Sequence, residues 1–197
     1  MDSLRQCAEN FARLTEYEYY IIAGRSSKGV KESIEFVVSF RKSDFFHLAG
    51  LHKLTDLPQV RHVRSNAISN IIDGRLTEAQ LYKSVRFCDI RDRLKAVASI
   101  ERFMDSNELI FRYDKHNVSN TTIEADYLMQ NVIDSCVTYL FLAKRREDDT
   151  QVCKSIFRKK NKDYTKGQQK FKLLYKEKIS TKTGEKVIQY DRLSPKS

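Results

Sequence analysis

The sequence predicts a single α+β domain: an N-terminal helix and β-hairpin, a central helical block, and a C-terminal antiparallel β-meander of about five strands. Two observations support this prediction. Apolar residues repeat at helical spacing in residues 83–104 and at every second position beyond Met104. The 197 residues include only 2 prolines and 6 glycines but 10 tyrosines and 11 phenylalanines, which is typical of a packed core.

The N-terminal segments alternate between helical and extended patterns. Leu4, Cys7 and Phe11 recur at helical spacing and predict a helix over residues 2–14. Two β-rich segments, residues 16–23 and 32–40, flank a turn from Gly24 to Gly29. This arrangement predicts a β-hairpin.

The central block contains several helical segments. Residues 45–54, FFHLAGLHKL, are apolar nearly all round and predict one buried helix. A second helix is expected over 60–72 and a long third one over 83–104. Between them, Thr77 and Gln80 form a capping-box pattern that indicates a short helix.

The C-terminal segments follow the strand period. The run CVTYLFLA, residues 136–143, is apolar at both parities and predicts the central strand of the sheet. We expect residues 1–191 to form one domain and residues 192–197 to be a frayed tail. The other expected strands are near residues 109–113, 123–127, 152–158, 170–179 and 185–191.

The net charge of +10 and the pI of about 9.4 indicate an anionic partner. The N-terminus has no apolar segment typical of a secretory signal, and no run of about 18 apolar residues occurs. We therefore expect a cytoplasmic protein that does not bind membranes. The four cysteines form no CxxC pair, so the sequence predicts buried free thiols and neither disulfides nor a zinc site.

The positive charge is concentrated near the C-terminus. Residues 154–178 contain ten lysines and arginines against Asp163 and Glu177, which gives +8 of the total of +10. Four lysines of residues 170–178 share one parity, so they are expected on one strand face. Such a row protects an edge strand from aggregation or, as we favour, contacts nucleic-acid phosphates. The candidate nucleic-acid-binding residues are Arg158, Lys159, Lys160, Lys162, Lys166, Lys170, Lys172, Lys176 and Lys178.

Histidine is the side chain best suited to acid–base chemistry near neutral pH, and the chain has four. On one continuous helix, His47 and His52 would be separated by about 140° and would not share a face. His47 is the stronger candidate, because apolar neighbours flank it and Gly50 permits close approach. His62 and His116 are expected to be exposed.

The C-terminal sheet offers further candidates. Asp126 lies in the segment EADYL, and Lys154, Ser155 and Arg158 lie in CKSIFR. By alternation, Ser155 is expected on the face of Cys153, with Lys154 and Arg158 on the opposite face. A lysine or arginine near a histidine would supply the cation that RNA cleavage needs at the reacting phosphate.

The segment FFHLAGLHKLTDLP resembles the phage nuclease family that groups barnase, EndoU, certain colicins and RelE. The matching positions include Phe45 or Phe46, His47, Leu48, Gly50, Leu51 and Lys53, with further matches at Ala125–Leu128, Leu140–Leu142 and Ser155–Phe157. The resemblance covers about residues 15–180. Ile156 departs from it, because a second phenylalanine is expected there.

The resemblance implies an α+β fold and metal-independent RNase chemistry in a phage or mobile element. The catalytic residues that it implies are His47, Lys53, Ser155 and Asp126, to which the basic sheet face adds Lys154. We therefore expect an endoribonuclease without metal or other cofactor, acting on RNA, with DNA as a possible substrate and an inhibitor or immunity protein as a possible partner. Two alternatives remain open: a non-catalytic nucleic-acid-binding module and a module that docks an acidic protein.

Overall fold

The computed structural model describes residues 2–27, 29–106 and 109–195. In this part of the chain there are eight strands and seven α-helices. The helices are α1 (Ser3–Leu14), α2 (Asp44–Leu48), α3 (Pro58–His62), α4 (Ala67–Ile72), α5 (Glu78–Leu81), α6 (Cys88–Ala98) and α7 (Ile100–Asp105). The strands are β1 (Tyr17–Ser27), β2 (Val30–Ser39), β3 (Leu109–Arg112), β4 (Tyr127–Ile133), β5 (Cys136–Lys144), β6 (Gln151–Arg158), β7 (Gln169–Ser180) and β8 (Lys186–Asp191).

The described strands form one sheet in the order β1-β2-β6-β5-β4-β3-β7-β8, and β1 also pairs with β7. Seven of these strands therefore close into a barrel, and β8 continues the sheet beyond β7. The predicted α+β fold with a five-stranded C-terminal meander is wrong. Strands β3 to β6 do pair as antiparallel neighbours, but β6 also meets β2 in parallel at Gln151 and Val38.

Strand β7 closes the barrel because it pairs with two different strands. Its first residues pair with β3, and residues from Lys172 to Ser180 pair with β1. A bulge at Leu174 separates the pairs Ala23–Leu173 and Ile22–Tyr175, and a bulge bends its strand. Alternation along a strand predicts which faces are buried but not which strand is its neighbour, so the sequence pattern missed the closure.

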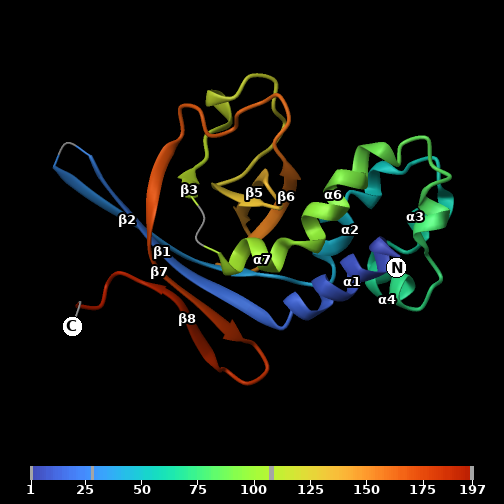
Figure 1. The fold of residues 1–197 in the computed structure, drawn as a ribbon, viewed down its shortest axis with the longest axis horizontal. Helices are drawn as coiled ribbons and strands as arrows, with labels where there is room; N and C mark the ends of the chain where they lie inside the picture. The colour runs from blue at the N-terminus through green and yellow to red at the C-terminus, as the bar shows by residue number, and fades with distance from the viewer. Residues whose placement is uncertain (1, 28, 107–108, 196–197) are drawn as a thin grey trace.

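The helices gather at one end of the barrel, and the hairpin of β1 and β2 extends from the other (Figure 1). Helix α1 packs on α4 and α6, while both α6 and α2 pack on β6. This packing places the short helix α2 beside the first residues of β6. No helix among the described residues is long and apolar enough to cross a membrane.

Strand β5 is apolar on both faces because it separates two buried clusters. Leu140 and Leu142 belong to the main core, which fills the barrel and continues between the helices. Tyr139 and Phe141 face a second cluster on the outside, which includes Phe111. Each buried aromatic or aliphatic side chain contributes about 1.5–3 kcal/mol, so both faces stabilise the barrel.

Several predicted helices are shorter than expected. Residues 45–54 form α2 and, after Gly50, a separate 3-10 helix at Leu51–Lys53. Residues 60–72 contain part of α3, a 3-10 turn and α4, and residues 83–104 form turns followed by α6 and α7. The helix at residues 2–14, the β1–β2 hairpin and the capping box of Thr77 and Gln80 are confirmed. The predicted tail at 192–197 lies partly outside the described residues.

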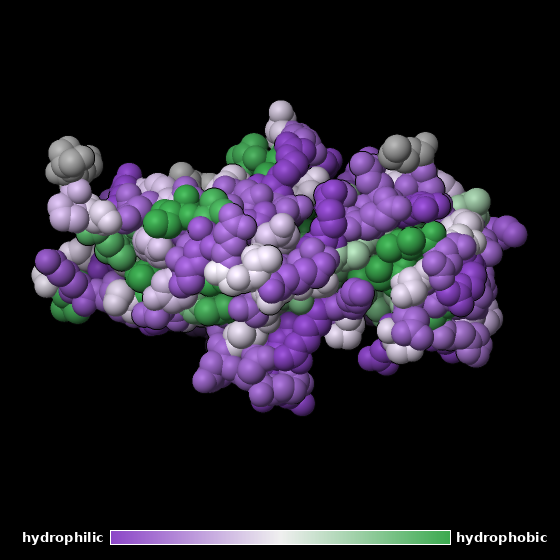
Figure 2. Space-filling model, turned by 90° about the horizontal axis from the view of Figure 1, so that it is seen from below, coloured by the Kyte–Doolittle hydropathy of each residue, from purple (hydrophilic) through white to green (hydrophobic). Residues whose placement is uncertain are grey.

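The surface is predominantly hydrophilic when seen from below the view of Figure 1 (Figure 2). The apolar areas on this face are separated by hydrophilic side chains. Of the four cysteines, Cys7 and Cys153 are buried, but Cys88 is exposed at the start of α6, so the expectation of four buried thiols is wrong there.

Candidate active site

Two histidine rings stack where the chain leaves α2. The ring centroids of His47 and His52 are 4.2 Å apart, and the ring planes are inclined by 13°. Both side chains are exposed to solvent. The prediction that they lie on different faces is wrong, because it assumed one helix over residues 45–54, whereas α2 ends at Leu48.

Gly50 turns the chain back between the two histidines. Its φ of 79° lies in the left-handed region, which glycine adopts without the steric cost of a Cβ. An added Cβ would lie 2.9 Å from Cδ of Arg93 and 3.0 Å from Cγ2 of Ile90. Gly50 therefore permits both the turn that carries His52 over His47 and close packing against α6.

Cationic side chains surround the stacked rings. Partial burial lowers the pKa of His47, and the charges of Arg93 and Lys154 lower it further. Partial burial, followed by the neighbouring His47, lowers the pKa of His52 to about 4. Partial burial and Arg93 also lower the pKa of Lys53. The neighbouring charges that lower the pKa values of these rings are positive. An anion bound among them would raise the pKa values again.

A cavity of about 360 Å³ opens beside Lys53 and Arg93. It lies between the first turns of α6 and the chain that follows β6. Phe157 and Tyr164 line it with aromatic rings, whose centroids are 5.4 Å apart. Such rings can stack on nucleobases of any sequence. The remaining lining residues are Asp89, Asp92, Arg158, Lys160, Asn161 and Lys162.

A second cavity, of about 580 Å³, lies on the other side of Lys154. Asp126 lines it, and the carboxylate of Asp126 accepts a hydrogen bond of 2.7 Å from the backbone N–H of Lys144. Among the described residues, no hydrogen bond or ion pair joins Asp126 to either histidine of the stack. Lys154 both lines this cavity and lowers the pKa of His47 through its charge. The other lining residues are Tyr113, Asp114, Lys115, His116, Glu124, Ala125, Ala143 and Arg146.

A β-bulge in β6 sets the direction of Lys154. Ser155 pairs with Phe141 and Cys153 pairs with Leu142, so Lys154 is the extra residue between them. The expected alternation fails here, because Cys153 joins the main core while Ser155 shares the face of Phe141. Ser155 is buried, with an exposed fraction of 8%, whereas Lys154 is exposed.

The expected lysine row on β7 is wrong. The bulge at Leu174 reverses the parity of the residues that follow it. Lys176 is therefore fully buried, and its ammonium donates to the backbone carbonyls of Met104 and Ser106. Lys178 forms ion pairs with Glu101 and Asp105. The lysines before the bulge, Lys170 and Lys172, are exposed.

Most basic residues at the end of β6 and directly after it already have partners. Lys159 pairs with Asp163 at 2.7 Å, Lys160 with Asp92 at 3.7 Å and Arg158 with Asp134 at 3.6 Å. Lys162 donates to the backbone carbonyls of residues 119 and 120, and Lys166 is exposed. The basic surface is therefore less continuous than the sequence suggested.

The structure thus brings His47, Lys53 and Lys154 together, with Asp126 one cavity away and Ser155 buried. Sequence reasoning missed His52 and Arg93. The signal that could have revealed His52 is Gly50, since a glycine two residues after Leu48 often ends a helix. In the described part of the chain, no group of three or more histidine, cysteine, aspartate and glutamate side chains is placed to hold a metal ion.

Comparison with protein families gives a match over residues 3–193 to the phage-Barnase-EndoU-ColicinE5/D-RelE like nuclease4 family. The chain belongs to this family. Membership of this nuclease family makes nucleic acid the substrate class and agrees with the resemblance seen in the segment around His47. Comparisons with curated proteins and with solved structures found no match. The assignment of site residues in this nuclease is therefore based on the geometry of its own chain.

Proposed function

We propose that the protein is an endoribonuclease that cleaves RNA without a metal ion and uses His47 and His52 as its acid–base pair. The observation that carries this proposal is the stack of the two rings among cationic side chains. Family membership supports a nuclease of phage type. The assignment of RNA as substrate, of a reaction without metal and of the two histidines rests on the ring stack.

The proposed reaction requires two proton transfers and one cationic site. A base removes the proton of the ribose 2′-OH, and the 2′-oxygen attacks the adjacent phosphorus. An acid then protonates the departing 5′-oxygen, so the products are a 2′,3′-cyclic phosphate and a free 5′-OH. Histidine suits both transfers, since each typically accelerates a reaction by about 10²–10⁴-fold.

The two histidines share the neighbouring charges of Arg93, Lys53 and Arg64, but Lys154 acts on His47, and this difference suggests separate roles. With a pKa of about 4, His52 is neutral at pH 7 and can accept the 2′-OH proton. Lys154 acts on His47 and can hold the substrate phosphate next to it. A bound phosphate places negative charge near His47, raises its pKa and allows it to donate a proton.

Cations stabilise the negative charge that develops on the phosphorus oxygens. Lys53, Arg93 and Lys154 come from three separate elements, and the side chain of Arg93 packs close to Gly50. Asp126 takes no direct part in this proposal but lines the cavity that Lys154 shares. We propose no catalytic role for Ser155, because its side chain is buried.

The proposal is tested by incubating purified protein with total RNA in EDTA. We expect the wild-type protein to shorten the RNA, and both His47→Ala and His52→Ala to lose this activity. The histidine that lies outside both the stack and the cavities provides a matched control, so His62→Ala retains it. Equal cleavage by all four proteins would contradict the assignment.

A nucleic-acid-binding module without catalysis is the second candidate. The burial of Ser155 and the position of Asp126 favour it, because both residues were expected beside the reacting phosphate. This function predicts that wild-type protein leaves RNA intact in the same incubation. The RNA would still shift in a gel, and added salt would abolish the shift.

A further inference from the structure

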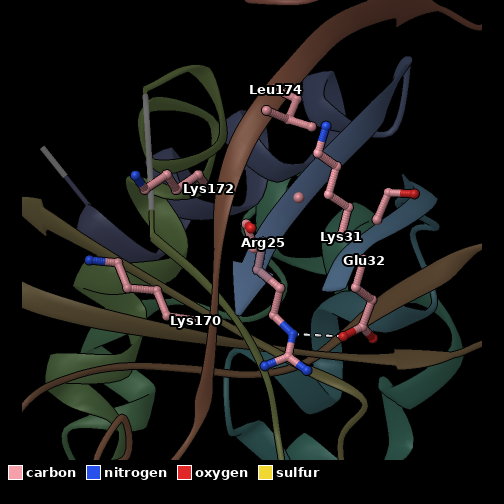
Figure 3. Close-up of a pocket in the computed structure, with 9 residues that line it drawn as sticks. Arg25, Lys31, Glu32, Lys170, Lys172 and Leu174 are labelled. Atoms are coloured by element: carbon pink, nitrogen blue, oxygen red, sulfur yellow. Dashed lines mark hydrogen bonds and ion pairs between the residues drawn. The ribbon is translucent and has the colours of Figure 1, made fainter. Parts of the chain in front are cut away.

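We propose that a basic cavity at the hairpin end of the barrel binds the phosphate backbone of the substrate strand, away from the reacting nucleotides. The proposal rests on the proposed nucleic-acid substrate and extends its binding site. The cavity has a volume of about 620 Å³ and lies between the β1–β2 hairpin and the first half of β7 (Figure 3).

The lining of this cavity carries an excess of positive charge. Arg25, Lys31, Lys170 and Lys172 line it, against a single carboxylate, that of Glu32. Within the described residues, the three lysines have no ion-pair partner. Like charges around one concavity repel each other, and a bound polyanion would replace this repulsion with attraction.

The one carboxylate is already shared by two arginines. Glu32 pairs with Arg25 and with Arg112, each at 2.6 Å. Both guanidinium groups also lie over the ring of Phe171, at 5.6 and 5.5 Å from its centroid. Glu32 therefore holds the arginines in place and leaves the charge of the lysines unbalanced.

The cations that line the cavity are spread over both sides of β7. The bulge at Leu174 and the missing side chain of Gly24 lie between the hairpin and β7, where an added Cβ on Gly24 would be 2.7 Å from Leu174 Cδ1. In Figure 3, the ammonium groups of Lys170 and Lys172 and the guanidinium of Arg25 appear on opposite sides of the β7 ribbon. Cations spread in this way fit successive phosphates of a strand better than one small anion.

This cavity shares no lining residue with the cavity beside Lys154. It would therefore be a separate contact for the substrate strand. Because the hairpin end and α2 lie toward opposite ends of the molecule (Figure 1), only a strand of many nucleotides can occupy both.

The test measures binding in the His47→Ala, His52→Ala background, so that RNA is not consumed. Fluorescence anisotropy follows single-stranded RNA of about 20 and about 4 nucleotides over a salt series. The cavity variant combines Lys31→Ala, Lys170→Ala and Lys172→Ala. We expect the logarithmic salt slope for the long RNA to fall by about 2, since each contact contributes about 0.7. Binding of the short RNA is expected to be unchanged.

A control variant removes the same charge elsewhere, through Lys83→Ala, Lys182→Ala and Lys186→Ala. We expect it to keep the wild-type slope. If the two variants have equal slopes, or if the long RNA does not bind at all, the cavity proposal is overturned. If the wild-type protein does not cleave RNA but binding depends on the three cavity lysines, the catalytic proposal is overturned and the cavity proposal stands. If the wild-type protein cleaves RNA but the cavity and control variants have equal salt slopes, only the cavity proposal is overturned.

Discussion

Gly50 determines whether His52 can lie over His47. Two properties are needed at this position: a positive φ and room for the side chain of Arg93. Gly74 offers a matched comparison, since its φ is also positive, at 75°, but an added Cβ would meet nothing within 4 Å. A comparison of alanine substitutions at the two glycines therefore distinguishes the effect of backbone strain from the effect of displacing the site.

We predict that Gly50→Ala and Gly74→Ala both lower the free energy of unfolding, by about 1–2 kcal/mol from the left-handed backbone. Only Gly50→Ala also displaces Arg93, and we expect it to lower the rate of RNA cleavage at least tenfold. Denaturant unfolding and cleavage assays at a temperature where both variants are folded measure the two effects. Equal loss of activity in both variants would contradict a specific role for Gly50.

The pKa values of the stacked histidines provide a direct readout of their surroundings. We predict that the pKa of His52 lies near 4 and that the pKa of His47 lies below its usual 6.5. Arg93→Gln removes a nearby positive charge and is expected to raise both pKa values. A bound 2′-deoxy oligonucleotide adds negative charge and is expected to raise them as well. NMR titration of the imidazole resonances measures these shifts, and unchanged values with the ligand bound would place the phosphate elsewhere.

The lowered pKa of His52 also makes stability depend on pH. Between pH 4 and 6.5 the unfolded chain binds a proton at this residue while the folded protein does not. The free energy of unfolding therefore rises with pH across this window, and the contribution is constant above it. We predict that His52→Gln has a flatter dependence of Tm on pH in this window. An identical pH dependence for both proteins would show that the native pKa is not lowered.

At the scale of elements, two β-bulges explain most differences between the expected and observed site. The bulge at Lys154 separates Cys153 from Ser155, and the bulge at Leu174 sends Lys176 inward. Hydrophobic alternation located most strands to within a few residues, but the strand predicted near residues 123–127 is wrong, because β4 runs from Tyr127 to Ile133. It could not reveal these insertions, because a one-residue shift moves every later side chain to the other face.

Lys176 illustrates the consequence for stability. Its buried ammonium bridges the carbonyls of Met104 and Ser106 at the end of α7. We predict that Lys176→Met lowers the free energy of unfolding by about 2–3 kcal/mol, since it leaves buried carbonyl groups without this donor. Lys170→Met, on the exposed part of the same strand, is expected to change it by about 0.5 kcal/mol or less. Urea unfolding compares them, and equal effects would contradict the buried position of Lys176.

The helical elements show the same division between what the sequence could and could not reveal. Apolar spacing was sufficient for α1, and the capping box marked α5. In residues 45–54 the same spacing predicted one helix, because a glycine inside an apolar run is compatible with helix. Gly50 was the available signal for the left-handed turn that ends α2, but nothing in the sequence indicated that Arg93 packs beside it.

At the scale of the whole molecule, closure of the barrel assembles the candidate site. The stacked histidines follow β2, Arg93 belongs to α6 and Lys154 belongs to β6. The parallel contact of β2 with β6 and the packing of α6 on β6 bring these three segments together. The sequence identified His47, Lys53 and Lys154 by residue type, but their convergence depends on pairings between distant segments.

The central claim is that the stacked histidines transfer protons to and from a ribose and its phosphate. The most direct measurement uses an RNA oligonucleotide that the wild-type protein cuts in EDTA, together with a copy that lacks the 2′-OH at the cut. We predict that the first yields a 2′,3′-cyclic phosphate in mass spectrometry, that the second stays intact, and that His47→Ala and His52→Ala cleave neither. Cleavage of the 2′-deoxy copy, or undiminished cleavage by both variants, would contradict the account.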